Sequence, residues 1–114
     1  MSTLSTHEKF IFDLNGFIVI RNVFSPEEIA AANAAIDAHS TDLIARNKAD
    51  LRNAKAGTPM SASGPRLDLG GILYWPEPHA KVFRSVLDHP KLVPYLTTFC
   101  GEGYRMDHQP QVIA

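Results

Sequence analysis

The stretch FIVIRNVFSPEEI, residues Phe17–Ile29, is the strongest fold signal in this chain of 114 residues. Its first part is β-branched and aromatic, so residues 17–21 predict a short strand. Its second part predicts the start of a helix. Ser25 can accept hydrogen bonds from free amides, Pro26 suits the first helical position, and Glu28 completes a capping box.

The regions on either side of this stretch also predict helices. Residues 6–14 predict a short helix with Thr6 as its N-cap and Asn15–Gly16 as its end. The helix that starts at Pro26 is expected to run to about Lys48, because apolar residues recur on one stripe along it. That stripe consists of Ile29, Ala32, Ile36, Leu43 and Leu51.

The second half of the chain predicts shorter elements. Residues 55–65 are rich in Gly, Pro and Ser and predict a flexible loop. Residues 66–75 return to apolar alternation, which indicates a short strand or an extended segment. Two short helices are expected next, at 78–87 and from Asp88 or His89 to Gly101, and residues 104–114 predict a final strand.

This order of elements predicts one α+β domain over residues 1–114. It lacks the alternating strand–helix units and the Gly-rich turn of a nucleotide-binding fold. Two or three strands make a thin sheet, so we expect exposed apolar surface unless further strands cover it. Because residues 104–114 predict a strand without closing turn residues, we also expect the chain to be the front part of a longer protein.

Composition excludes several classes of function. The net charge is −1 and the basic residues are scattered, which argues against a nucleic-acid or anionic-membrane partner. The longest apolar run, Phe17–Ile20, is far shorter than the roughly 18 residues of a spanning helix. We therefore expect a cytoplasmic protein. Cys100 is the single cysteine, which excludes an internal disulfide, and it is interpreted as a buried structural thiol.

The residue pattern predicts neither a complete metal site nor a nucleophilic triad. The five histidines form no H-x-D, H-x-E or H-x-x-x-H pair, and there is no Gly-x-Ser-x-Gly turn. Four of them are interpreted as structural: His7, His39, His79 and His89. His39 is expected to face solvent on the long helix, and His89 is a capping candidate.

His108 stands out because it lies in the predicted final strand between Asp107 and Gln109. A strand with polar side chains on both faces can line a wet cavity, although an exposed edge strand explains the pattern equally well. Tyr74 and Trp75 could stack on a ligand or could seal the edge of a core.

Two segments, Asp13–Ile29 and Phe83–Leu96, resemble the phytanoyl-CoA dioxygenase family. They match its short helix, its apolar strand, its "S/T-x-E-E" helix start and its later pair of Pro-containing helices. The resemblance implies the N-terminal helices and first strands of a double-stranded β-helix (jelly roll) whose core is incomplete in this chain. It implies Fe(II) and 2-oxoglutarate as cofactors of the intact protein. The iron ligands would come after residue 114, so no catalytic or metal-binding residue is expected here.

The resemblance also suggests cofactor-binding residues. His108 would lie beside 2-oxoglutarate, with Gln109 and Arg66 as weaker candidates. The intact protein would hydroxylate a small organic or acyl substrate, whereas these 114 residues alone are expected to be inactive and to bind neither cofactor tightly. The alternative is a small non-catalytic α+β module that binds a protein partner through an exposed sheet edge.

Overall fold

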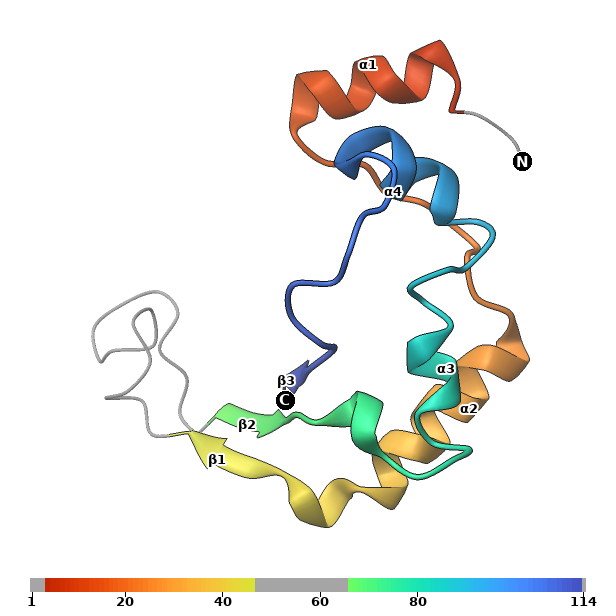
Figure 1. The fold of residues 1–114 in the computed structure, drawn as a ribbon. Helices are drawn as coiled ribbons and strands as arrows, with labels where there is room; N and C mark the ends of the chain where they lie inside the picture. The colour runs from red at the N-terminus through yellow and green to blue at the C-terminus, as the bar shows by residue number, and fades with distance from the viewer. Residues whose placement is uncertain (1–3, 47–65, 114) are drawn as a thin grey trace.

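A computed structural model describes residues 4–46 and 66–113 of the chain. Within these residues the chain is α+β, with four α-helices and a small antiparallel sheet (Figure 1). The predicted loop at 55–65 lies outside the described residues. In chain order the elements are α1 (Thr6–Asn15), α2 (Pro26–Ala38), the 3-10 helix η1 (Ser40–Asp42), β1 (Ile44–Arg46), β2 (Arg66–Leu69), the 3-10 helix η3 (Ile72–Tyr74), α3 (Lys81–Arg84), α4 (Val93–Cys100) and β3 (Val112–Ile113).

Local hydrogen bonds define the starts of α1 and α2. The amide of Glu28 donates to Ser25 Oγ at 3.1 Å, and the amide of Ser25 donates to Glu28 Oε1 at 2.9 Å. The predicted capping box of α2 is therefore confirmed. The N-cap of α1 is Ser5, one residue before the predicted Thr6, because Ser5 and Glu8 form a second capping box. As predicted, α1 ends at a glycine, Gly16, which adopts the left-handed conformation with φ 76°.

Helix α2 is shorter than predicted: it ends at Ala38, well before Lys48. Its C-cap is His39, and the segment Ser40–Asp42 that follows forms η1 instead. Ser, Thr and Asp side chains compete for backbone hydrogen bonds and thus favour helix ends and turns over helix interiors. Leu43 nevertheless packs against the core from beyond the helix.

Two of the predicted strands also differ from the structure. Residues 17–21 form no strand in the described part of the chain, because this segment pairs with none of β1, β2 and β3. In the predicted strand 104–114 only β3 pairs, at Asp68↔Ile113 and Leu69↔Val112. Beyond Leu69 the partner strand turns away, with Gly71 at φ 69°.

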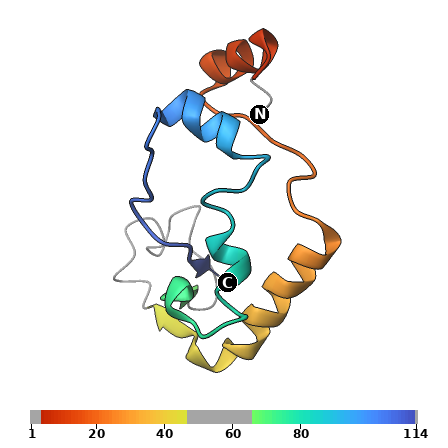
Figure 2. The same cartoon turned by 45° about the vertical axis from the view of Figure 1, so that its right-hand side comes forward.

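The sheet has the order β1-β2-β3, and its register separates two faces. One face carries Ile44, Asp68 and Ile113 side by side, because Asp68 is the cross-strand partner of both isoleucines. Leu69 and Val112, next along their strands, point to the other face, which packs against the core. Helix α2 passes beside the sheet on that side (Figures 1 and 2).

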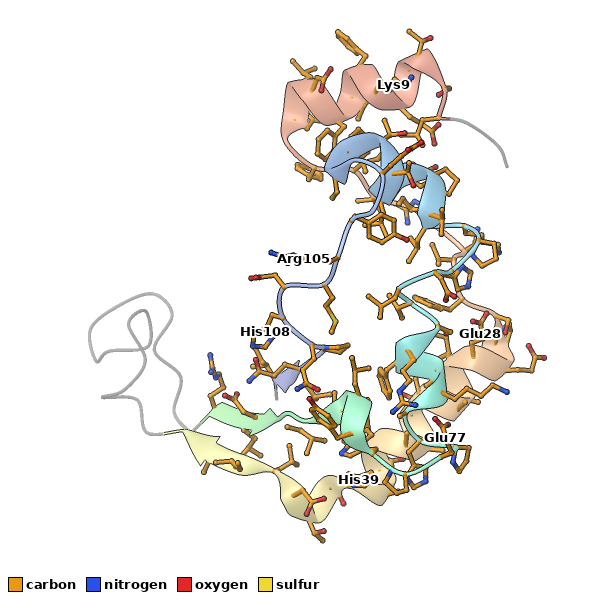
Figure 3. The ribbon with its side chains drawn as sticks, in the orientation of Figure 1. Lys9, Glu28, His39, Glu77, Arg105 and His108 are labelled. Atoms are coloured by element: carbon orange, nitrogen blue, oxygen red, sulfur yellow. The ribbon has the colours of Figure 1, made fainter. Side chains whose placement is uncertain are left out.

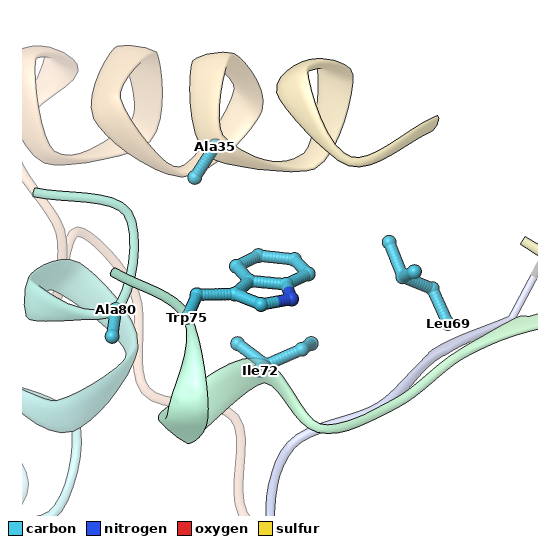
Figure 4. Packing of buried hydrophobic residues seen from close by; sticks show 5 residues of the cluster. All are labelled: Ala35, Leu69, Ile72, Trp75 and Ala80. Carbon is cyan, nitrogen blue, oxygen red and sulfur yellow. The ribbon is translucent and has the colours of Figure 1, made fainter. Parts of the chain in front are cut away.

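The main core joins α2, β2, η3 and α3 around one tryptophan. The indole of Trp75 lies between Ala35 of α2 and Ile72 of η3 (Figure 4). Ile72 and Ala80 are fully buried. The buried members of the cluster are Ala35, Leu69, Ile72, Trp75 and Ala80, with Ile36, Leu43, Phe83 and Val112 packed around them.

A second, smaller contact joins α1 to α4 at the other end of the molecule (Figure 1). The rings of Phe12 and Phe99 stack with their centroids 3.8 Å apart. The hydroxyl of Tyr95 donates a hydrogen bond to Glu8 Oε1. No residue of either helix is buried. Side-chain pairs, rather than a shared core, therefore hold α1 on α4.

The molecule is an open frame. Its radius of gyration is 17.2 Å, whereas a compact domain of this length has about 13 Å. Large apolar side chains are exposed, as the sequence predicted, and they include Phe10, Leu14, Phe17, Val19 and Ile29. Among the helices of the described residues, none is long and apolar enough to cross a membrane.

Candidate functional site

A cavity of about 300 Å³ lies beside the segment 104–110, where the sequence places its main candidate, His108. Its walls are mostly apolar and come from α3 and the turn that follows it, from α4 and from this segment. Arg105 and His108 supply its basic groups, both from the segment 104–110 (Figure 3). The lining residues are Phe83, Val86, Leu87, Leu96, Tyr104, Arg105, Met106, His108 and Pro110. An apolar cavity with basic groups at one side suits a small organic anion.

His108 lies in an exposed bend and not in a strand, so its predicted mid-strand position is wrong. Two side-chain contacts hold the segment away from the sheet. Tyr104 donates from its hydroxyl to the carbonyl of Leu87, and Gln109 Oε1 accepts from the amide of Leu73 at 3.3 Å. His108 Nδ1 lies 2.7 Å from the carbonyl oxygen of Gln109. Because a carbonyl only accepts, Nδ1 carries a proton there, and in the neutral ring Nε2 is left as an acceptor.

Arg66, the third candidate, lies elsewhere. It begins β2 and donates from Nη2 to Asp68 Oδ2 at 2.7 Å. By strand alternation Arg66 and Asp68 share the sheet face opposite the main core. No hydrogen bond or ion pair within residues 4–46 and 66–113 joins Arg66 to His108 or Gln109. The structure thus places His108 beside the cavity, the Gln109 side chain on the amide of Leu73, and Arg66 on the sheet.

The structure also brings together a cluster that the sequence did not predict. His39 Nδ1 lies 3.1 Å from Asp42 Oδ2, and His39 Nε2 lies 3.0 Å from His79 Nδ1. The His39 ring stacks on Trp75, with centroids 4.0 Å apart and an interplanar angle of 3°. We call Asp42, His39 and His79 the histidine relay. It lies where α2 ends (Figure 3).

The predicted solvent-facing position of His39 on a long helix is wrong. Helix α2 ends one residue earlier, so His39 is its C-cap and its side chain is only 16% exposed. The i, i+3 spacing of His39 and Asp42 was the one local signal of this contact. His79 lies 40 residues further along, and no spacing rule connects it to His39.

The relay contains two histidines and a carboxylate, but these do not converge on one point. Asp42 contacts Nδ1 of His39, whereas His79 contacts Nε2 on the opposite edge of the ring. A facial iron triad needs all three groups on one ion. Across the described ranges, no group of three or more His, Cys, Asp or Glu side chains could hold a metal ion.

His89 is buried and links α2 to the turn before α4. The amide of Lys91 donates to its Nδ1 at 3.2 Å, and its Nε2 lies 3.4 Å from Glu28 Oε2. The backbone amide of Ser25 is the main cause of the lowered pKa of Glu28, and His89 lowers it further. The predicted capping of the next helix by Asp88 or His89 is wrong, because α4 begins at Val93 with Leu92 as its N-cap and has no side-chain cap; His89 instead accepts from Lys91 in the turn before the helix.

The predictions for Cys100 and for the aromatic pair Tyr74 and Trp75 can also be compared with the structure. Cys100 is exposed at the end of α4, so its predicted burial is wrong: no described element covers that side of the helix. Trp75 belongs to the core, while its neighbour Tyr74 is 85% exposed. Of the two interpretations for this aromatic pair, sealing a core therefore applies to Trp75.

No protein-family model matches the chain, and comparisons with curated proteins and with solved structures found no similar protein.

Proposed function

We propose that this chain is the N-terminal portion of an Fe(II)/2-oxoglutarate-dependent oxygenase that hydroxylates a small organic or acyl substrate. The proposal rests on the resemblance of residues 13–29 and 83–96 to the phytanoyl-CoA dioxygenase family. The α+β architecture, with a capped α1 and a capped α2 before the first strands, is compatible with it.

The observation that carries the proposal is the exposure of two isoleucines on either side of a buried Asp68, on one face of the sheet. Leu69 and Val112 pack against the Trp75 cluster. On the opposite face Ile44 and Ile113 are each 58% exposed, on either side of Asp68. Two stacked sheets are how a jelly roll buries such a face. In the proposal, β1–β3 belong to one sheet of the jelly roll, α2 supports that sheet from outside, and later strands cover Ile44 and Ile113.

Within residues 4–46 and 66–113 the side chains do not fit the role of iron ligands, since His39, His79 and Asp42 fail to converge. In the proposal the ligands follow residue 114, and this part of the protein shapes the surroundings of the centre. His108 and Gln109 lie beside 2-oxoglutarate, and Arg66 lines the interior face of the sheet. Their shared task is to orient the cosubstrate and to exclude water.

The test uses the gene and the longest polypeptide that it encodes. We expect an H-x-D motif soon after the codon for Ala114. With Fe(II) and 2-oxoglutarate, we expect the encoded protein to form succinate. His108→Ala should weaken 2-oxoglutarate binding, whereas His7→Ala, an exposed change on α1, should leave it unaltered. A protein without the motif and without succinate formation would contradict the proposal.

The second candidate is a non-catalytic module that binds a protein through the sheet edge. The exposed Ile44 and Ile113 on the two outer strands favour it, because an edge strand with apolar side chains can accept a further strand. Ile44→Lys separates the two candidates. In the module it abolishes partner binding while leaving the free chain folded, and in the oxygenase it unfolds the sheet and lowers succinate formation.

A further inference from the structure

We infer that His39 and His79 form a binding site for one divalent transition-metal ion of the Cu²⁺, Ni²⁺ or Zn²⁺ class. This site is separate from the iron centre of the proposed function and does not depend on it. The ion would replace the hydrogen bond between the two imidazoles.

The spacing of the two nitrogens suits chelation. His39 Nε2 and His79 Nδ1 are 3.0 Å apart, and the two rings are perpendicular, at 89°. Bonds from such ions to imidazole nitrogen are about 2.0–2.1 Å long. Two neighbouring ligands of one ion are therefore about 2.9 Å apart in square-planar geometry and about 3.3 Å apart in tetrahedral geometry. The observed separation lies between these values, so small side-chain rotations are enough to seat the ion.

The positions of the protons on the imidazole rings of the histidine relay also favour metal binding. The ionised Asp42 carboxylate accepts a hydrogen bond from His39 Nδ1–H, which leaves the lone pair of His39 on Nε2, facing His79. A carboxylate that holds an imidazole in this tautomer is the usual support behind a metal-binding histidine. His79 donates its Nδ1 proton to His39 in the absence of metal. When the ion binds, His79 takes its other neutral tautomer, with the proton on Nε2, so no net proton is released.

The surroundings of His39 make the site rigid and reachable. Its ring lies flat on Trp75, which belongs to the main core. It also caps the C-terminal end of α2, where the helix dipole favours a positive charge. The His39 side chain keeps 16% of its surface exposed and His79 is half-buried, so an ion has access from solvent. Solvent or an external ligand would fill the remaining coordination positions.

Trp75 provides an intrinsic probe, because it is the single tryptophan of the chain and its ring stacks on His39. We expect Cu²⁺ to quench its fluorescence in a saturable titration with one ion per chain, and Zn²⁺ to reverse the quenching by competition. His79→Asn keeps the stack with Trp75 and should weaken the apparent affinity about tenfold or more. Asp42→Asn should weaken it about tenfold through His39.

The matched control is His7→Asn, which removes an exposed histidine from α1 and should leave the titration unchanged. Circular dichroism of each variant checks that it is folded. A titration of His79→Asn that equals that of the unchanged chain would overturn the site, and so would an equal loss in His7→Asn. A second measurement needs no variant: substoichiometric Cu²⁺ should broaden the imidazole NMR signals of His39 and His79 first. Earlier broadening at any other histidine would refute the inference.

Discussion

At the scale of single residues, the position at which a helix ends decides what a side chain can contact. His39 would face solvent if α2 continued to Lys48. Because α2 ends at Ala38, the ring turns onto Trp75 and meets His79. The polar segment Ser40–Asp42 both ends the helix and supplies the carboxylate that orients this ring.

The N-cap of α2 leads to the first prediction. Ser25→Ala removes the acceptor for the amide of Glu28 and should lower the free energy of unfolding by about 1 kcal/mol. Ser25→Gly should lower the free energy of unfolding by only a few tenths of a kcal/mol, because glycine leaves the cap amides open to water. Chemical denaturation of both variants measures the difference. Equal losses in the two variants would show that the cap hydrogen bond is not the cause.

A second prediction concerns the dependence of stability on pH through Glu8. The hydrogen bond from Tyr95, followed by the backbone amide of Ser5, lowers the pKa of Glu8 below its ordinary value of 4.5. A carboxyl with a lowered folded pKa stabilises the fold fully above its unfolded pKa, and this contribution is lost as the pH falls through the folded pKa.

Thermal unfolding from pH 6 to pH 3 measures this contribution. Glu8→Gln should reduce stability at pH 6 and flatten the decline toward pH 3. Tyr95→Phe should act in the same direction, because it removes the donor. Tyr104→Phe offers a control, since it removes a tyrosine hydrogen bond to the backbone carbonyl of Leu87 and should keep the slope of the profile against pH. An unaltered profile in Glu8→Gln would refute the prediction.

At the scale of elements, the helices fall into two sets with different support. Helices α2 and α3 pack on the Trp75 core, whereas α1 meets α4 through side-chain pairs. Helix α1 has no buried residue, so it should open independently of the core.

Phe99→Ala tests this independence. Loss of the Phe12–Phe99 stack removes about 0.5–1.5 kcal/mol beyond the buried area, so the amides of α1 should exchange faster with solvent while those of α2 stay protected. Hydrogen exchange measured by mass spectrometry resolves the two helices.

Phe83→Ala is the matched control, because it removes an aromatic contact of the main core. The ring of Phe83 packs edge-on against Trp75, with the ring centroids 5.9 Å apart. It should speed the exchange of α2 and spare α1. If Phe99→Ala speeds exchange equally in both helices, the two sets form one cooperative unit.

At the scale of the whole molecule, the open frame explains why large apolar side chains remain exposed. A radius of gyration of 17.2 Å, against about 13 Å for a compact chain, leaves much of the surface without a packing partner. In the proposed function, later strands of the same polypeptide cover part of this apolar surface.

The open frame predicts a specific solution behaviour. Small-angle scattering of the 114-residue chain should give a radius of gyration near 17 Å, and the chain should bind a hydrophobic dye. In a longer polypeptide that completes a jelly roll, dye binding should fall. A scattering radius near 13 Å without dye binding would show that the chain closes on its own.

Some of this structure could be read from neighbouring residues alone. Ser25, Pro26 and Glu28 predict the start of α2, and Gly16 and Gly101 predict the ends of α1 and α4. Each of these features depends on hydrogen bonds within one turn of helix, which the local sequence contains in full.

Other features needed partners that are distant in the chain. Residues 17–21 have strand-forming composition but no strand beside them in the described structure, since a strand exists only with a hydrogen-bonded neighbour. His108 lies in a bend and not in the predicted strand, because Tyr104 is hydrogen-bonded to Leu87 and Gln109 is hydrogen-bonded to Leu73. The contact of His39 with His79 spans 40 residues and forms only when α2 and the turn before α3 pack around Trp75. Short-range hydrogen bonds therefore set the helix ends, whereas packing between distant segments decided the sheet, the cavity beside His108 and the histidine relay.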